Sequence, residues 1–215
     1  MSDPESADCL LLGDIVGSRS APDRRQVHAA LTEALAAVER ALPSRRGLAV
    51  TVGDEFQGAY AALGDALEVA LRVRLLLLPD VDVRLGIGRG GASVLDAGRG
   101  VEDGPGWWAA REALEAVEER AGHAATRLLR TAHRDPAAAP GHVEAVNAAL
   151  LCRDHLVGSL SDRSLRLLRG LMDPDTTQAE LAAREGVSAS AVSQRVRADG
   201  IGAVLAAQAL LRELP

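Results

Sequence analysis

The stretch "TVGDEFQGAY", residues 51–60, sets a Gly-Asp turn between two runs of strand-forming residues. The run "LAVTV" at 48–52 precedes the turn and "EFQGAY" at 55–60 follows it, so we predict a β-hairpin over residues 48–60. Asp54 and Glu55 are adjacent in this turn, and their carboxylates repel each other. Such a pair is typical of a cation site, of proton transfer, or of turns in general, which tolerate Asp.

The sequence around the hairpin predicts an α+β fold. An apolar run at Cys9–Leu12 indicates a buried strand ended by Gly13–Asp14. Residues 22–42 and 64–78 have the apolar spacing of helices, and residues 81–91 alternate like a strand with a glycine-rich end. The resulting order, β-α-β-β-α-β, is that of a ferredoxin-like domain, in which two helices cover one face of an antiparallel sheet.

This topology predicts where two of the acidic residues meet. The first and third strands of a ferredoxin-like sheet lie side by side at its centre, so Asp14 and Asp54 should share one edge of the sheet. Two carboxylates together with phosphate oxygens suit Mg²⁺ or Mn²⁺. Without the cation, mutual repulsion should raise the pKa of one of the two. The alternative use of each Gly-Asp pair is local, as a turn or a helix cap.

Beyond residue 91 the pattern becomes mainly helical. We predict a helix at 107–121, with one of Trp107 and Trp108 facing the core, and another at 143–157. The intervening residues 124–142 are rich in Ala, Pro and Gly and are interpreted as a loop or lid. "IGRGG" at 87–91 lacks the spacing of a phosphate-binding loop and is interpreted as a tight turn or bulge.

Composition favours a cytoplasmic protein of two domains, about 8–158 and 159–215. Of the 215 residues 47% are hydrophobic, which is enough for a core, although only 2% are aromatic. No basic-apolar leader or span-length apolar segment is apparent, so no membrane partner is expected. The net charge of −6 argues against a general polyanion binder, but residues 159–215 are balanced, with 7 Arg against 7 acidic residues.

The segment "TTQAELAAREGVSASAVSQRVRADG" predicts a helix-turn-helix. Thr176 or Thr177 caps the first helix, Gly186 allows the turn, and Val192 and Val196 face inward. The segment resembles bacterial helix-turn-helix modules, and polar residues on its outer face suit DNA. The predicted DNA-binding residues are Ser190, Ser193, Gln194 and Arg197. The alternative is a helical hairpin that packs on the first domain or dimerises.

The motifs "GDIVGSR", "TVGDEFQGAY", "VRLGIGRGG" and "GPGWWAAREALE", in this order, resemble the SatD family of bacterial proteins. The resemblance covers roughly residues 8–215. That family has no assigned biochemical activity, so the resemblance adds little to the functional expectation by itself.

More distantly, the N-terminal motifs resemble class III nucleotidyl cyclases and diguanylate cyclases, which share a palm-type ferredoxin-like core. The resemblance implies that Asp14 and Asp54 hold Mg²⁺ or Mn²⁺ and that Arg111, in "AAR", stabilises a transferring phosphoryl group. Any catalytic role would fall to Arg111. The other nucleotide-binding residues that the comparison suggests are Gly17, Arg19, Gly53, Glu55 and Arg89.

Two departures from the cyclase pattern favour binding over turnover. Trp107 stands where cyclases have an Asn, and the chain has no lysine to hold a phosphate or select a base, a role left to Arg19 or Arg89. Positioning supplies most of the catalysis in such enzymes. The expected function is therefore that of a regulator with a metal- and nucleotide-binding domain and a DNA-binding domain. Because cyclase-like domains act at dimer interfaces, a homodimer is expected. The alternatives are a metal-dependent nucleotidyltransferase or cyclase, and an inactive scaffold.

Overall fold

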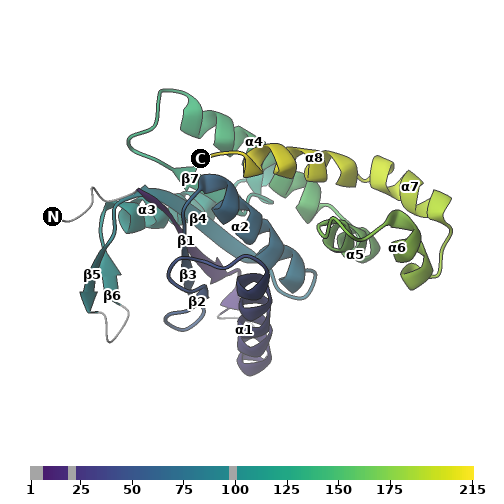
Figure 1. The fold of residues 1–215 in the computed structure, drawn as a ribbon, viewed down its shortest axis with the longest axis horizontal. Helices are drawn as coiled ribbons and strands as arrows, with labels where there is room; N and C mark the ends of the chain where they lie inside the picture. The colour runs from purple at the N-terminus through teal and green to yellow at the C-terminus, as the bar shows by residue number, and fades with distance from the viewer. Residues whose placement is uncertain (1–6, 19–22, 97–100) are drawn as a thin grey trace.

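The fold is seen in a computed structural model that describes residues 7–18, 23–96 and 101–215 (Figure 1). Its main sheet has five strands in the order β2-β3-β1-β4-β7, and a separate two-stranded sheet pairs β5 with β6. The strands are β1 (Asp8–Ile15), β2 (Ala49–Val50), β3 (Phe56–Tyr60), β4 (Val83–Gly90), β5 (Ser93–Asp96), β6 (Val101–Asp103) and β7 (Thr131–Arg134). The predicted α+β class is confirmed.

Strand β1 is central and pairs antiparallel with both β3 and β4. The expected adjacency of the first and third strands is therefore confirmed. The expectation that Gly13–Asp14 ends the first strand is wrong, because pairing with β4 continues to Ile15, opposite Val83. Gly13 fits inside the strand because the ring of Phe56 fills the space where its side chain would lie.

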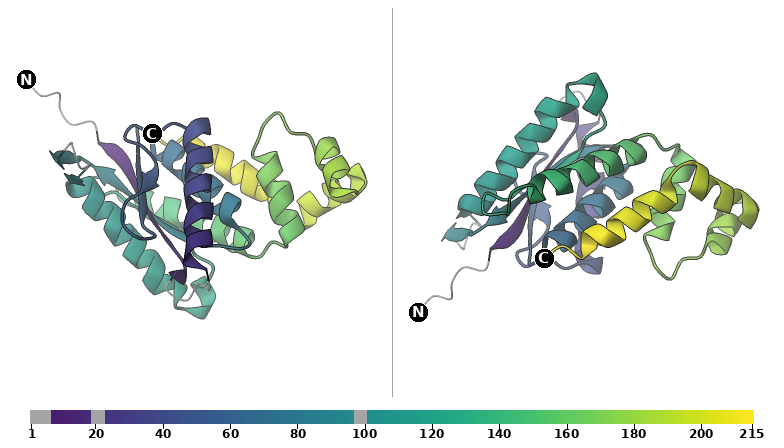
Figure 2. Two further views of the ribbon diagram at one scale, coloured as in Figure 1. Left: turned by 90° about the horizontal axis from the view of Figure 1, so that it is seen from below. Right: turned by 90° about the horizontal axis from the view of Figure 1, so that it is seen from above.

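Helices cover both faces of the sheet (Figure 2). The alternation of β1 sends Cys9 and Leu11 into a core shared with α1 and α2, and Leu10 and Leu12 into a core shared with α3. The helices are α1 (Arg24–Ala41), α2 (Leu63–Leu77), α3 (Pro105–Ala121), α4 (His142–Gly158), α5 (Asp162–Leu171), α6 (Gln178–Glu185), α7 (Ala189–Ala198) and α8 (Ile201–Arg212), with a short 3₁₀ turn at Ala124–Thr126. As expected, one tryptophan faces the core: Trp107 is 8% exposed and Trp108 58%.

The glycines of β4 let α3 lie directly on the sheet. A Cβ at Gly86 or Gly88 would overlap the backbone of α3, including the amide nitrogen of Ala110. The interpretation of "IGRGG" as a turn or bulge is wrong for residues 87–90, which continue β4 in regular register with β1. These glycines do not change the direction of the chain. Because they have no side chains, they allow α3 to approach the strand closely.

The segment 124–142, interpreted as a loop or lid, contains an additional strand. β7 pairs parallel with β4 at the edge of the sheet. Side chains of α4 bind its outer edge: Asp154 accepts from the Thr131 amide (2.6 Å), and Asn147 both accepts from and donates to the backbone of His133. Four residues, "TAHR", are too few to show alternation, and their strand depends on these partners.

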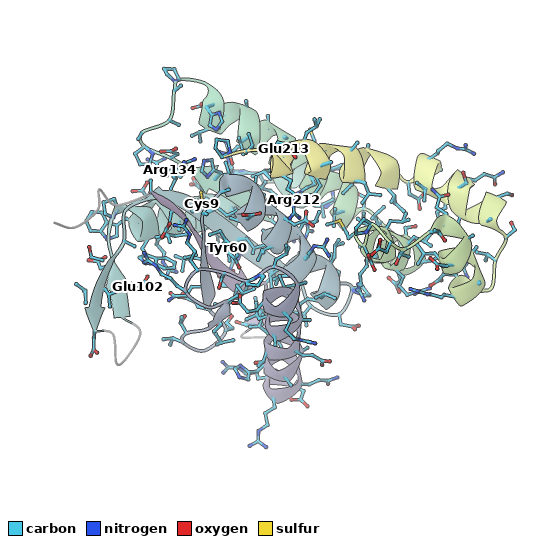
Figure 3. All side chains as sticks on the ribbon, in the orientation of Figure 1. Cys9, Tyr60, Glu102, Arg134, Arg212 and Glu213 are labelled. Carbon is cyan, nitrogen blue, oxygen red and sulfur yellow. The ribbon has the colours of Figure 1, made fainter. Side chains whose placement is uncertain are left out.

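The C-terminal helices pack against the N-terminal part. One apolar cluster joins Leu71 and Leu75 of α2 to Leu168 of α5 and Val204 of α8. Helix α8 packs against α2, and Arg212, the last residue of α8, lies at this contact (Figure 3). The last residues supply the missing cap of α2, because the amides of Leu63 and Gly64 donate to the carbonyls of Pro215 and Leu214. Within the described ranges, no helix is long and apolar enough to cross a membrane.

Replacing Gly88 by Ala should destabilise the fold, because the added methyl group would meet backbone atoms of α3 that cannot move independently. We expect a loss of about 1–3 kcal/mol in the free energy of unfolding, measured in urea. Gly202→Ala is the control, since its Cβ would meet only Val196 at 3.9 Å. Equal stability of both variants would contradict direct packing of α3 on β4.

Candidate functional site

The end of β1 and the hairpin before β3 form one wall of an acidic cavity of about 390 Å³. Asp14 lies near the end of β1, and Asp54 follows Gly53, whose φ of +66° makes the turn. Both line the cavity, so the expected juxtaposition of these two residues is confirmed. The lining residues are Asp14, Ile15, Gly17, Ser18, Asp54, Glu55, Arg84 and Glu118.

Arg84 holds the carboxylate of Asp14. The two residues are register partners on β1 and β4, and Arg84 donates to both carboxylate oxygens of Asp14 through Nε and Nη2, each at 2.8 Å. Its Nη1 lies 2.6 Å from Glu118 of α3. Asp14 is thus bound by a guanidinium that a second carboxylate also holds.

The pKa of Asp14 is raised, but mainly for a reason that the sequence did not indicate. Burial of the carboxyl group is the largest cause, and the charges of Glu118 and Asp54 add to it, while Arg84 lowers it. The pKa of Arg84 is raised, because hydrogen bonds and attraction from its two carboxylate partners outweigh the effect of burial. One guanidinium, that of Arg84, therefore pairs with two carboxylates, those of Asp14 and Glu118, so this cluster has an excess of negative charge.

A second ion pair joins the hairpin to α3. Arg111 donates through Nη1 and Nη2 to the two carboxylate oxygens of Glu55, at 3.0 and 2.9 Å. These hydrogen bonds raise the pKa of Arg111. Arg111 is therefore beside the cavity, as a phosphate-binding role requires, but it is already occupied by Glu55. A phosphate would have to compete with that carboxylate.

The cavity and its rim carry an excess of negative charge. Four carboxylates, Asp14, Asp54, Glu55 and Glu118, face two guanidiniums, Arg84 and Arg111. Across the described ranges, no group of three or more His, Cys, Asp or Glu residues is arranged as a metal site. Any cation here would rely on two carboxylates and on oxygens from another molecule, which is a common arrangement for Mg²⁺.

A neighbouring cavity, also about 390 Å³, carries basic residues. It shares Ile15, Ser18 and Asp54 with the acidic cavity and is completed by Gly53 and by four residues of α1: Arg24, Arg25, Val27 and His28. The sequence analysis did not identify these basic residues. The "DRR" run could have indicated them, because an Asp that caps a helix places the two following arginines in its first turn, as Asp23 does for α1.

The remaining predicted ligand-binding residues lie in different places. Gly17 lines the acidic cavity and Gly53 the basic one. Arg19 lies outside the described residues. Arg89 is not part of either cavity: it is the register partner of Cys9, at the opposite end of β1 from Asp14, and donates to the Pro215 carbonyl at 2.6 Å. The assignment of Arg89 to this site is wrong, because β4 runs antiparallel to β1.

Helices α6 and α7 form a compact hairpin at one end of the molecule (Figure 1). Thr177 and Glu180 form a complete capping box on α6, Gly186 has a φ of +65° at the turn, and Ser188 caps α7. Val192 and Val196 are buried as expected. On the opposite side of α7, Ser190, Gln194 and Arg197 are exposed and Ser193 is half-buried.

Comparison with known proteins identifies a family but no characterised relative. The family model described as the SatD family matches residues 9–214 of the chain. A search of curated proteins found no match.

Substitutions around Asp14 should move its pKa in opposite directions. Arg84→Gln should raise it further, because the one neighbour that lowers it is lost, whereas Glu118→Gln should lower it. Since the folded-state pKa is already raised, ionisation of Asp14 destabilises the fold as the pH rises through that pKa. A ¹³C NMR titration of the aspartate carboxyl groups measures both shifts, and shifts of the same sign would refute this account.

Proposed function

The chain belongs to the SatD family, and we propose that it is a regulator whose N-terminal part binds a divalent cation with a nucleotide and whose C-terminal helices bind DNA. The observation that carries the first half is the acidic cavity shared by Asp14 and Asp54, which is contiguous with a basic one. Proposed with it are a ferredoxin-like, palm-type core for β1 to β4, and a helix-turn-helix for α6 and α7.

The two cavities have complementary tasks in this proposal. Mg²⁺ or Mn²⁺ bridges Asp14 and Asp54, and a nucleotide's phosphates complete its coordination. A carboxylate oxygen has two lone pairs, so Asp14 can accept from Arg84 and still bind the ion. The phosphates then extend toward Arg24 and Arg25, which supply the positive charge that the acidic cavity lacks, and toward His28, whose ring can donate a hydrogen bond.

Arg111 is the residue that would decide between binding and catalysis. If a phosphate displaces Glu55, the guanidinium of Arg111 is free to stabilise a transferring phosphoryl group, as a nucleotidyltransferase or cyclase needs. Its bidentate pairing with Glu55 favours binding without turnover, so the enzyme is the second candidate. A scaffold acting through protein contacts would require neither metal nor nucleotide.

The case for DNA binding rests on the exposed side of α7. Ser190, Gln194 and Arg197 follow one another at intervals of four and three residues, so they share one face of the helix. The guanidinium of Arg197 has no hydrogen-bonding or ion-pair partner in the described part of the chain, whereas that of Arg195 pairs with Asp199 at 3.4 Å. Helices α5 and α8 support the inner side of the hairpin, which leaves this face available for a major groove.

Metal and nucleotide together should stabilise the protein, because a ligand bound only by the folded state shifts unfolding by mass action. At 100 times its Kd a ligand adds about 2.7 kcal/mol. Thermal shift with Mg²⁺ or Mn²⁺ and each nucleoside triphosphate should show this for the wild type and for Glu119→Gln, an exposed control on α3. The increment should disappear in Asp54→Asn. Stabilisation that survives in Asp54→Asn would place the ligand elsewhere.

Loss of Arg197 should weaken DNA binding and its salt dependence. In fluorescence anisotropy with random-sequence duplexes, Arg197→Ala should reduce the slope of log K against log salt by about 1. Arg40→Ala, which removes an exposed arginine of α1, is the charge-matched control. If both variants bind like the wild type, or if the wild type does not bind, α7 is not a recognition helix.

A further inference from the structure

A third cavity, of about 220 Å³, lies where the N-terminal part meets the C-terminal helices. Its walls come from α1, α2 and α5, and it is separate from the two cavities of the proposed nucleotide site. The lining residues are Ala37, Val38, Ala41, Arg72, Leu75, Leu76, Arg169 and Met172.

Most of this wall is apolar, but one cation in it lacks a counter-ion. Arg169 donates through Nη2 to the Leu78 carbonyl at 2.7 Å. Its Nε is buried and has no acceptor, and no carboxylate lies within ion-pair distance of it among the described residues. Burial, followed by the nearby charge of Arg166, lowers the pKa of Arg169, and the exposed Asp80 opposes this from a distance.

The second arginine in the wall already has a carboxylate partner. Arg72 donates through Nε to Glu68 at 2.6 Å and through Nη2 to the Met172 carbonyl at 2.7 Å. The cavity therefore carries one unbalanced positive charge. A half-buried cation without a counter-ion is costly, and an anion that enters the cavity would neutralise the guanidinium of Arg169.

We propose that this cavity binds a small aliphatic carboxylate, with its carboxylate on Arg169 and its chain among Val38, Leu75 and Met172. A carboxylate matches the planar guanidinium and brings one negative charge, whereas a phosphate would bring a second charge for which the wall offers no partner. The small volume restricts the ligand to a short chain. Because the ligand touches α1, α2 and α5 together, its binding strengthens the attachment of the C-terminal helices.

Hexanoate is the probe, with hexanamide as its uncharged counterpart. Isothermal titration of the wild-type chain should show saturable one-to-one binding of hexanoate, and thermal shift should show stabilisation. Hexanamide should do neither. Arg169→Gln should weaken binding roughly tenfold or more, because a charge-assisted contact is lost. Ala37→Leu, which fills part of the cavity and retains Arg169, should abolish binding.

Two further variants distinguish binding in this cavity from a general loss of charge and from binding at the proposed nucleotide site. Arg163→Gln removes a charge from the same helix outside the cavity and should bind hexanoate like the wild type. Asp54→Asn should also bind hexanoate normally, so failure of the nucleotide proposal would leave this one intact. The proposal is overturned if the wild type shows no saturable binding, if hexanamide binds as well as hexanoate, or if Arg169→Gln or Ala37→Leu binds hexanoate as tightly as the wild type does.

Discussion

The close contact between α3 and β4 is the constraint on which the candidate site depends. Gly86 and Gly88 offer no side chains on this face, so the backbone of the helix rests directly on the backbone of the strand. That contact sets the distance at which Glu118 reaches Arg84 and Arg111 reaches Glu55. With bulkier residues on β4, α3 would move outward and both ion pairs would open.

These ion pairs are the contacts that the proposed ligand would have to exchange. In the structure Arg111 pairs with Glu55, Asp14 and Glu118 share Arg84, and Asp54 adds a further negative charge. A divalent ion with phosphates would redistribute these contacts, with the ion on the aspartates and the guanidinium of Arg111 on the phosphate. The arginines would then act as internal counter-ions that keep a cluster of carboxylates stable when no ligand is present.

The C-terminal helices are bound to the sheet by polar contacts as well as by the apolar cluster. Arg153 of α4 is fully buried and donates to Gln208 of α8 at 2.9 Å and to Thr131 of β7 at 3.0 Å. Arg74 of α2 reaches both Asp82 and Asp154, and the lowered pKa of Asp82 shows that Arg74 and Arg130 outweigh its burial. Because Arg153 bonds to both β7 and α8, a shift of β7 would change the position of α8, which in turn contacts α7.

The helices, the hairpin at 48–60 and the convergence of Asp14 and Asp54 could be predicted from the amino-acid order, because they follow from local periodicity and from one strand order. The sequence also limited the cap of α6 to Thr176 or Thr177, because a capping box involves neighbours within three residues. The packed structure was needed to show that Asp14 pairs with Arg84, 70 residues away, and Glu55 with Arg111, 56 residues away. It alone placed Arg89 at the opposite end of β1 and made a strand of "TAHR". Such contacts depend on which residues the packed sheet and helices bring together, and no spacing along the chain encodes that.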